Sequence, residues 1–141
     1  VSNVRKDVSL RFAHEEQIRV FGDRDLIKQL VLNLVDNAVK YSPDGGEVVV
    51  SLHRKDSVAE LAVADRGPGI PADQAEQIFE RFYRVPNSQS RTVGGAGIGL
   101  AISRWIARVH GGDIRVESND GRGSRFVVAL PAEADSDPMP L

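Results

Sequence analysis

The chain has 141 residues, of which 41% are hydrophobic and 27% are charged, and its formal net charge at pH 7 is −2. This length suits one domain with a single core, and the composition is that of a folded globular protein rather than a disordered or membrane-embedded one. The near balance of charge gives no general attraction to nucleic acid or anionic membranes, and the absence of cysteine excludes disulfides and thiolate metal sites.

Alternation of apolar and polar residues predicts two short strands at the start of the chain. Val8, Leu10 and Phe12 form the first alternating run, and Ile18 and Val20 form the second.

A long helix is predicted to follow Asp23, which stands at the N-cap position, and to extend to about Tyr41. Its apolar residues cover an arc of about 180° on a helical wheel. Turn residues 42–46 then separate the helix from two strands, at 48–52 and 58–64, that we expect to pair in an antiparallel hairpin.

The second half of the chain predicts two more helices and two more strands. A short helix is expected at 72–82 and a long one at 100–110, ended by Gly111 and Gly112. Strands at 113–117 and 124–130 flank a glycine turn. This order predicts a two-layer α/β sandwich, in which a mixed, mostly antiparallel sheet of about five strands is covered on one face by three helices.

Two asparagines border the apolar face of the first helix. A buried amide without partners costs about 1 to 3 kcal/mol, so Asn33 and Asn37 need an explanation. Hydrogen bonds to nearby backbone would explain one of them. For a pair one turn apart, with Lys40 on the same edge, a shared polar ligand is the better explanation, because amide oxygens suit Mg²⁺ and lysine suits phosphate.

Asp65 follows a predicted strand in which Leu61 and Val63 share its face, so we expect its carboxylate to point toward the core. A buried carboxylate needs donors, and the exocyclic amine of adenine is one. A lone Asp-x-Gly pattern, however, more often marks only the start of a turn.

Glycines at 94, 95, 97 and 99 run directly into the helix that starts near Leu100. Free N–H groups at a helix N-terminus form an anion site, although a flexible glycine linker is the alternative interpretation. No strand precedes these glycines and no Gly-Lys-Ser/Thr follows them, which argues against a Rossmann or a Walker site. Phe79 and Phe82 are three positions apart, so we expect them to pack a helix onto the core rather than to stack on nucleic-acid bases.

Five motifs, taken in order, resemble those of the catalytic domain of sensor histidine kinases. This domain belongs to the ATPase superfamily of DNA gyrase B subunits, mismatch-repair ATPases and heat-shock chaperones, which share the Bergerat fold. The motifs are an asparagine box, a first glycine box, a phenylalanine box, a second glycine box and a final glycine motif, at residues 32–42, 65–70, 78–84, 95–102 and 121–126.

The resemblance implies ATP and Mg²⁺ as cofactors. By it, Asn37 would bind the metal, Asn33 would support metal and phosphates, and Asp65 would read the adenine amine. Lys40 and Arg84 would contact phosphate, with Arg84 reaching the γ-phosphate during transfer. The remaining nucleotide contacts would come from Tyr41, Gly67, Gly69, Ile70, Gly95, Gly97, Ile98, Gly99, Leu100 and Ser124.

The implied activity is phosphoryl transfer to a protein histidine. Gln29 stands where hydrolytic relatives carry a glutamate that activates water, and glutamine is a poor base. No histidine here has the acceptor context of the family, since His14-Glu15 lacks a nearby proline. We therefore expect residues 1–7 to be a linker from dimerisation and phosphoacceptor helices outside the chain, 8–131 to be the ATP-binding domain, and 132–141 to be a disordered acidic tail.

The same resemblance implies partners and a location. The partners would be the dimerisation domain and then a response regulator, in a homodimeric, membrane-anchored bacterial protein whose cytoplasmic domain this chain forms; the fragment alone would be monomeric. Residues 86–95 are expected to act as a lid. Two alternatives stay open: a serine kinase of the anti-sigma type and a nucleotide-sensing module without transferase activity.

Overall fold

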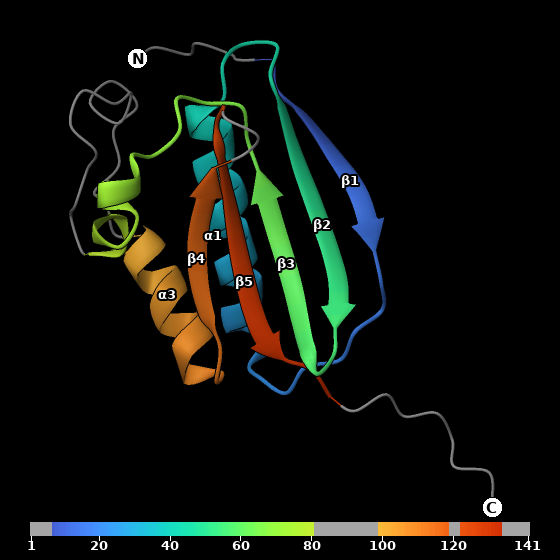
Figure 1. Ribbon diagram of the computed structural model, residues 1–141. Helices are drawn as coiled ribbons and strands as arrows, with labels where there is room; N and C mark the ends of the chain where they lie inside the picture. Colours follow the sequence, from blue (N-terminus) through green and yellow to red (C-terminus); the bar gives the residue numbers. More distant parts are fainter. Residues whose placement is uncertain (1–6, 81–98, 119–121, 134–141) are drawn as a thin grey trace, which may run out of the picture.

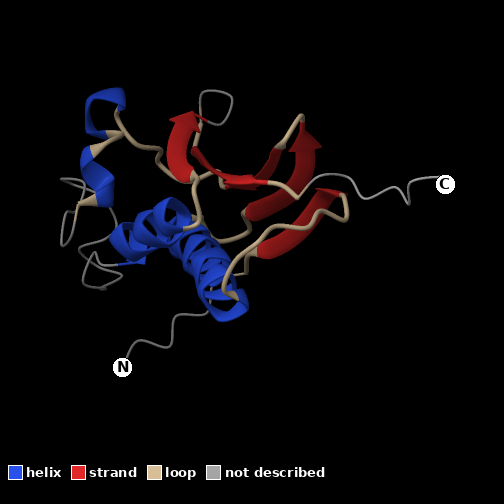
Figure 2. Cartoon of the chain, turned by 90° about the horizontal axis from the view of Figure 1, so that it is seen from below, coloured by secondary structure: helices blue, strands red, loops and turns tan. Residues whose placement is uncertain are grey.

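The computed structural model describes residues 7–80, 99–118 and 122–133. Its elements form two layers, a five-stranded sheet and a helical layer that lies against one face of it (Figure 1, Figure 2). The predicted two-layer α/β sandwich with a mixed, mostly antiparallel sheet is confirmed.

The sheet contains β1 (Ser9–Glu15), β2 (Glu47–Lys55), β3 (Val58–Ala64), β4 (Asp113–Ser118) and β5 (Ser124–Pro131). The strand order is β1-β2-β3-β5-β4. β1 pairs with β2 in parallel and the other pairs are antiparallel, so the predicted hairpin of β2 and β3 is confirmed.

The helical layer contains α1 (Arg24–Tyr41), α3 (Gly99–Val109) and the 3-10 turns η1 (Ala72–Gln74) and η2 (Gln77–Phe79). Asp23 caps α1 as predicted, because its Oδ1 accepts hydrogen bonds from the N–H groups of Asp25 and Leu26. Gly111 adopts a φ of 83° directly after α3, the left-handed conformation in which helices commonly end.

The core lies between the helices and the sheet face that they cover. Leu34 of α1, Ile106 of α3 and Val63 of β3 are completely buried there, and Phe79 packs edge-on against Phe126. The apolar residues of α1, α3 and β3 therefore point inward as expected, whereas Leu10 and Phe12 of β1 are exposed. Burial of the inward-pointing residues is the main source of stability.

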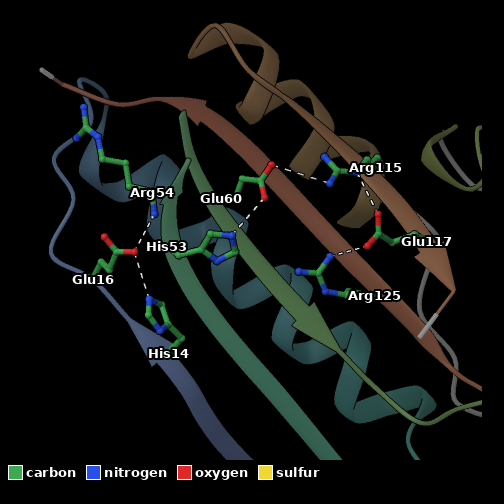
Figure 3. A network of polar contacts seen from close by, with 8 residues as sticks. All are labelled: His14, Glu16, His53, Arg54, Glu60, Arg115, Glu117 and Arg125. Carbon is green, nitrogen blue, oxygen red and sulfur yellow. Dashed lines mark hydrogen bonds and ion pairs between the residues drawn. The ribbon is translucent and has the colours of Figure 1, made fainter. Parts of the chain in front are cut away.

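Among the described residues, no helix or strand covers the opposite face of the sheet, yet Ala62 and Val127 on that face are almost fully buried. Long charged side chains lie over them and form a network of ion pairs and hydrogen bonds on the side away from α1 (Figure 3). Arg and Glu side chains cover apolar surface with their methylene stems while their charged ends stay in water.

Two expectations about local structure were wrong. Ile18 and Val20 do not form a strand; the backbone between them makes a single bond, from the N–H of Glu133 to the C=O of Arg19, instead of a ladder. Within 72–80 the expected helix is replaced by two 3-10 turns, because the buried residues there, Ile78 and Phe79, are adjacent and do not form a helical stripe.

Within the described parts of the chain, no helix has both the length and the apolar character that crossing a bilayer requires.

Candidate functional site

Asp65 lies at the end of β3 and is 3% exposed, so the predicted inward orientation of its side chain is confirmed. Its Oδ1 accepts hydrogen bonds from the backbone N–H groups of Gly67, at 2.8 Å, and Ser124, at 3.3 Å. Burial raises the pKa of this carboxyl, and the two backbone hydrogen bonds only partly oppose that effect. A buried carboxylate held in this way is a preoriented acceptor.

Gly67 brings the end of β3 against the end of α1. A Cβ atom on Gly67 would lie 2.3 Å from the carbonyl oxygen of Tyr41, so no side chain fits between the two segments. Gly123 allows a similarly close approach between the end of β3 and the start of β5. Its φ is 84°, and a Cβ atom on Gly123 would lie 2.0 Å from the carbonyl oxygen of Asp65. The glycines therefore fix how closely the backbone approaches Asp65.

Asn33 and Asn37 are both half-buried on α1. The Nδ2 atom of Asn33 donates a 3.4 Å hydrogen bond to the carbonyl oxygen of Gly99, the first residue of α3. Asn33 is thus placed beside the first residue of α3, and Asn37 lies one turn further along α1. Because α3 begins at this point, its N-terminal backbone also contributes partial positive charge there.

The other predicted residues of this region lie near the contact between Gly67 and Tyr41 or near the start of α3. Lys40 is exposed in the last turn of α1, and Tyr41 is half-buried beside Gly67. Gly69 is half-buried, and Ile70 and Leu100 pack against the core.

Some predicted residues lie outside the described residues. They are Arg84, Gly95, Gly97, Ile98 and the expected lid at 86–95. The structure therefore places the α1, β3 and β5 sides of the candidate site, together with the start of α3.

Arg104 of α3 is a residue that sequence reasoning missed. Its side chain is 15% exposed and pairs with Glu76, at 3.0 Å, and with Asp113, at 3.1 Å. Its guanidinium also lies 4.8 Å from the ring centroid of Phe79. This arginine joins α3 to the η1–η2 segment and to β4, and no pattern within the helix indicates these contacts.

No group of three or more His, Asp or Glu side chains among the described residues could hold a metal ion. A metal in this region would therefore need other ligands, such as an amide oxygen and oxygens of a bound ligand. The buried carboxylate, the glycine contacts and the two half-buried amides fit an uncharged base at one end and a metal-bound anion at the other.

A family model described as histidine kinase-, DNA gyrase B-, and HSP90-like ATPase matches residues 22–134. The chain is 45% identical over 126 residues to the sensor-like histidine kinase SenX3 of Mycobacterium tuberculosis, covering 89% of this chain and 31% of that protein. The chain thus spans about a third of the length of this curated relative.

Solved structures agree with this likeness. A mycobacterial sensor histidine kinase, MprB, superposes with a TM-score of 0.79 at 36% identity, covering 90% of this chain and 83% of that chain. Full-length ShkA in complex with AMPPNP superposes with a TM-score of 0.77 at 28% identity, covering 94% of this chain and 27% of that one.

Proposed function

Because the chain belongs to the histidine kinase-, DNA gyrase B-, and HSP90-like ATPase family, we propose that it is the ATP-binding catalytic domain of a two-component sensor histidine kinase. It transfers the γ-phosphoryl group of ATP to a histidine on a separate dimerisation domain. The observation that carries this proposal is Asp65, a buried carboxylate at the end of β3 whose Oδ1 is fixed by two backbone N–H groups.

Asp65 recognises the base. An ionised carboxylate is purely an acceptor, and the exocyclic amine of adenine is a donor that guanine lacks at the same position. Gly67 lets the end of β3 pack against the carbonyl oxygen of Tyr41, and Gly69 turns the backbone at a φ of 81°, so both glycines shape the wall of the site beside this carboxylate. Ile70 adds half-buried apolar surface, and Ser124 positions the carboxylate through its N–H group.

Asn37 binds Mg²⁺ and Asn33 supports the metal and the phosphates. Mg²⁺ usually keeps several waters and takes few protein ligands in addition to phosphate oxygens, which suits a single amide oxygen. Mg²⁺ held there would supply positive charge that offsets the charge of the phosphates. Lys40 adds a positive charge at the end of α1, and Tyr41 lies against the nucleotide.

The phosphates are held by backbone and arginine groups at the other side of the site. Gly99 and Leu100 at the start of α3 present N–H groups, and Gly95, Gly97 and Ile98 continue this contact. Arg84 stabilises the charge that develops on the γ-phosphate during transfer. Gln29 is exposed on α1 and is a poor base, so it does not activate water, which favours transfer over hydrolysis.

The histidines of this chain are not phosphoacceptors. His110 uses both ring nitrogens, since Nε2 accepts from the N–H of Asp23 and Nδ1 donates to the carbonyl oxygen of Ile106. His14 and His53 contact Glu16 and Glu60 on the exposed sheet face (Figure 3). The acceptor belongs to the dimerisation domain that precedes a linker at 1–7, and a response regulator takes the phosphoryl group from it.

In this proposal the domain lies on the cytoplasmic side of a membrane-anchored, homodimeric bacterial protein. Residues 8–131 are its folded unit and residues 132–141 are a tail. Two other activities of the same fold compete with this proposal. A serine kinase of the anti-sigma type would phosphorylate a partner's hydroxyl group, and a nucleotide sensor would bind ATP without transfer.

One experiment separates the three activities. The chain is incubated with γ-labelled ATP, Mg²⁺ and candidate helical domains that carry a histidine followed by an acidic residue. Acid-labile, alkali-stable label on the partner supports the proposal, whereas acid-stable label identifies a serine kinase. Nucleotide binding without label on any partner identifies a sensor, and label on His14, His53 or His110 contradicts the need for a separate acceptor domain.

A further inference from the structure

A hollow of about 260 Å³ opens on the face of the sheet that the helices leave uncovered. The surface is recessed at this point because the side chains of Ser51, Ala62 and Ala64 are small. Three arginines line it, Arg11, Arg66 and Arg125, with Glu47 as the single carboxylate among the lining residues. We call this feature the arginine hollow.

The strand register places two of the arginines on opposite walls. Arg11 pairs with Val49, Val49 with Ala64, and Ala64 with Arg125, so the four residues form one row across β1, β2, β3 and β5. Adjacent strands lie about 4.8 Å apart, which puts the two arginine Cα atoms about 14 Å from each other. Arg66 stands on the same face, two residues beyond Ala64.

The three guanidinium groups retain donors for a ligand. Arg66 is exposed and makes no ion pair with any residue in the parts of the chain that the structure describes. Arg11 pairs with Glu47 at 3.3 Å and Arg125 pairs with Glu117 at 2.5 Å. Each guanidinium has five N–H donors, and partly exposed ion pairs are weak, so neither pair occupies its arginine completely.

We propose that the arginine hollow binds a small dicarboxylate. Its volume of about 260 Å³ equals that of about nine liquid water molecules, which suits a diacid of four or five carbons. Arg11 holds one carboxylate, and Arg66 with Arg125 holds the other, through charge-assisted hydrogen bonds. The methylene groups lie over the apolar floor at Val49 and Ala64.

Two residues that line the hollow, Arg66 and Arg125, directly follow Asp65 and Ser124 in the chain. Successive residues of a strand point to opposite faces, so Asp65 faces the helices while Arg66 faces the hollow, and Ser124 and Arg125 divide in the same way. The N–H of Asp65 donates to the carbonyl oxygen of Ser124 at 2.8 Å. A ligand that draws Arg66 and Arg125 together therefore acts on the backbone that orients Asp65. An effect of this ligand on nucleotide affinity would depend on the proposed function, whereas binding of the ligand in the hollow would not.

The test is an NMR titration of the ¹⁵N-labelled 141-residue chain without nucleotide. Succinate is the dicarboxylate probe, butyrate is the monocarboxylate control, and sodium chloride matches the ionic strength. We expect saturable shifts with succinate at the amides of Val49, Ala64, Arg66 and Arg125, and weaker binding of butyrate by about tenfold. Arg66→Gln should weaken succinate binding by about tenfold, whereas Arg108→Gln, which removes the same charge from α3, should leave it unchanged.

Four results would overturn the proposal. One is that succinate shifts these amides no more than salt does, and another is that butyrate binds as tightly as succinate. The third is that the Arg66 and Arg108 variants bind succinate equally. The fourth is that a polyglutamate peptide binds at the same amides more tightly than succinate. That result would identify an acidic protein segment, and not a small dicarboxylate, as the ligand. Because no nucleotide is present, failure here leaves the proposed ATP site untested and intact.

Discussion

Nε2 of His110 accepts a 2.9 Å hydrogen bond from the backbone N–H of Asp23, which ties the residue after α3 to the N-cap of α1. Nδ1 of the same ring contacts the carbonyl oxygen of Ile106 at 2.7 Å. The ring therefore joins the start of α1 to the end of α3, and the start of α3 meets the middle of α1 where Asn33 contacts Gly99.

Replacing His110 by alanine should lower the free energy of unfolding by about 0.5 to 1.5 kcal/mol, because the N–H of Asp23 loses its acceptor and the helices lose their link. Urea denaturation measures this loss. His14→Ala is the matched control, since that ring is exposed on the open sheet face and should cost less than about 0.5 kcal/mol. Equal losses in the two variants would show that the helix link does not contribute.

Arg104→Ala should destabilise the domain by about 1 to 3 kcal/mol, because the partly buried guanidinium holds Glu76, Asp113 and the ring of Phe79 together. Arg104→Lys should recover part of the loss, since it keeps the charge but not the planar donors. Arg11→Ala, which removes an exposed pair with Glu47, should cost about 0 to 1 kcal/mol. Thermal unfolding compares the three variants, and an Arg104 loss no larger than the Arg11 loss would contradict the anchoring role.

Gly123→Ala should destabilise the domain more than Gly45→Ala. Both glycines have positive φ values, 84° and 81°, so both substitutions carry the conformational cost of about 1 kcal/mol. A Cβ at Gly45 meets nothing within 4 Å, whereas one at Gly123 comes within 2.0 Å of the carbonyl oxygen of Asp65. The difference between the two unfolding free energies isolates this steric contact; no difference would mean that β3 and β5 can separate freely at this point.

The pH dependence of stability should change when Asp65 becomes asparagine. Burial raises the pKa of Asp65 above its ordinary 3.8, so the folded state holds this proton more tightly than the unfolded state. Stability from this group is therefore present at low pH and is lost as pH rises through the folded-state pKa. Asparagine keeps an oxygen for the two N–H donors but has no charge to bury, so the variant should gain stability relative to the original chain as pH rises.

Asp113 gives the opposite sign and serves as the control. Burial raises its pKa, but hydrogen bonds from the N–H of Ile114 and from Arg108 and Arg104 outweigh this, and the net pKa lies below 3.8. Its contribution to stability is present above that ordinary value and is lost as pH falls through the folded-state pKa. Unfolding free energies from pH 3 to pH 8 should therefore diverge in opposite directions for Asp65→Asn and Asp113→Asn; parallel curves would contradict the burial of Asp65.

Much of the fold could be predicted from local patterns. The apolar stripe and the Asp23 cap define α1, and alternation along β3 places Asp65 on the core side, because both patterns depend on residues close together in the chain. Alternation of apolar and polar residues gave a wrong strand prediction where the alternating run was short. Ile18 and Val20 alternate over one pair only, and nothing local shows that this segment lacks a partner strand.

Long-range contacts could not be predicted, since no local pattern encodes them. Asn33 and Gly99 are 66 positions apart, and Asp65 and Ser124 are 59 apart, so the sequence could indicate a polar ligand near each asparagine or aspartate but not the contacts that position it. The anchor at Arg104 was missed for the same reason. The assignment of individual residues to base, metal and phosphate stays a prediction.

The most direct test of the central claim is calorimetric titration of Mg-ATP into the chain and into Asp65→Asn. The amide places a donor where the carboxylate would accept from the adenine amine, so we expect a loss of about 1.5 to 3 kcal/mol, or about ten- to a hundredfold in affinity. The pH measurements above establish that the variant is folded. Affinity for Mg-ATP reduced to that extent in a folded variant supports Asp65 as the adenine-binding group, and unchanged affinity contradicts it.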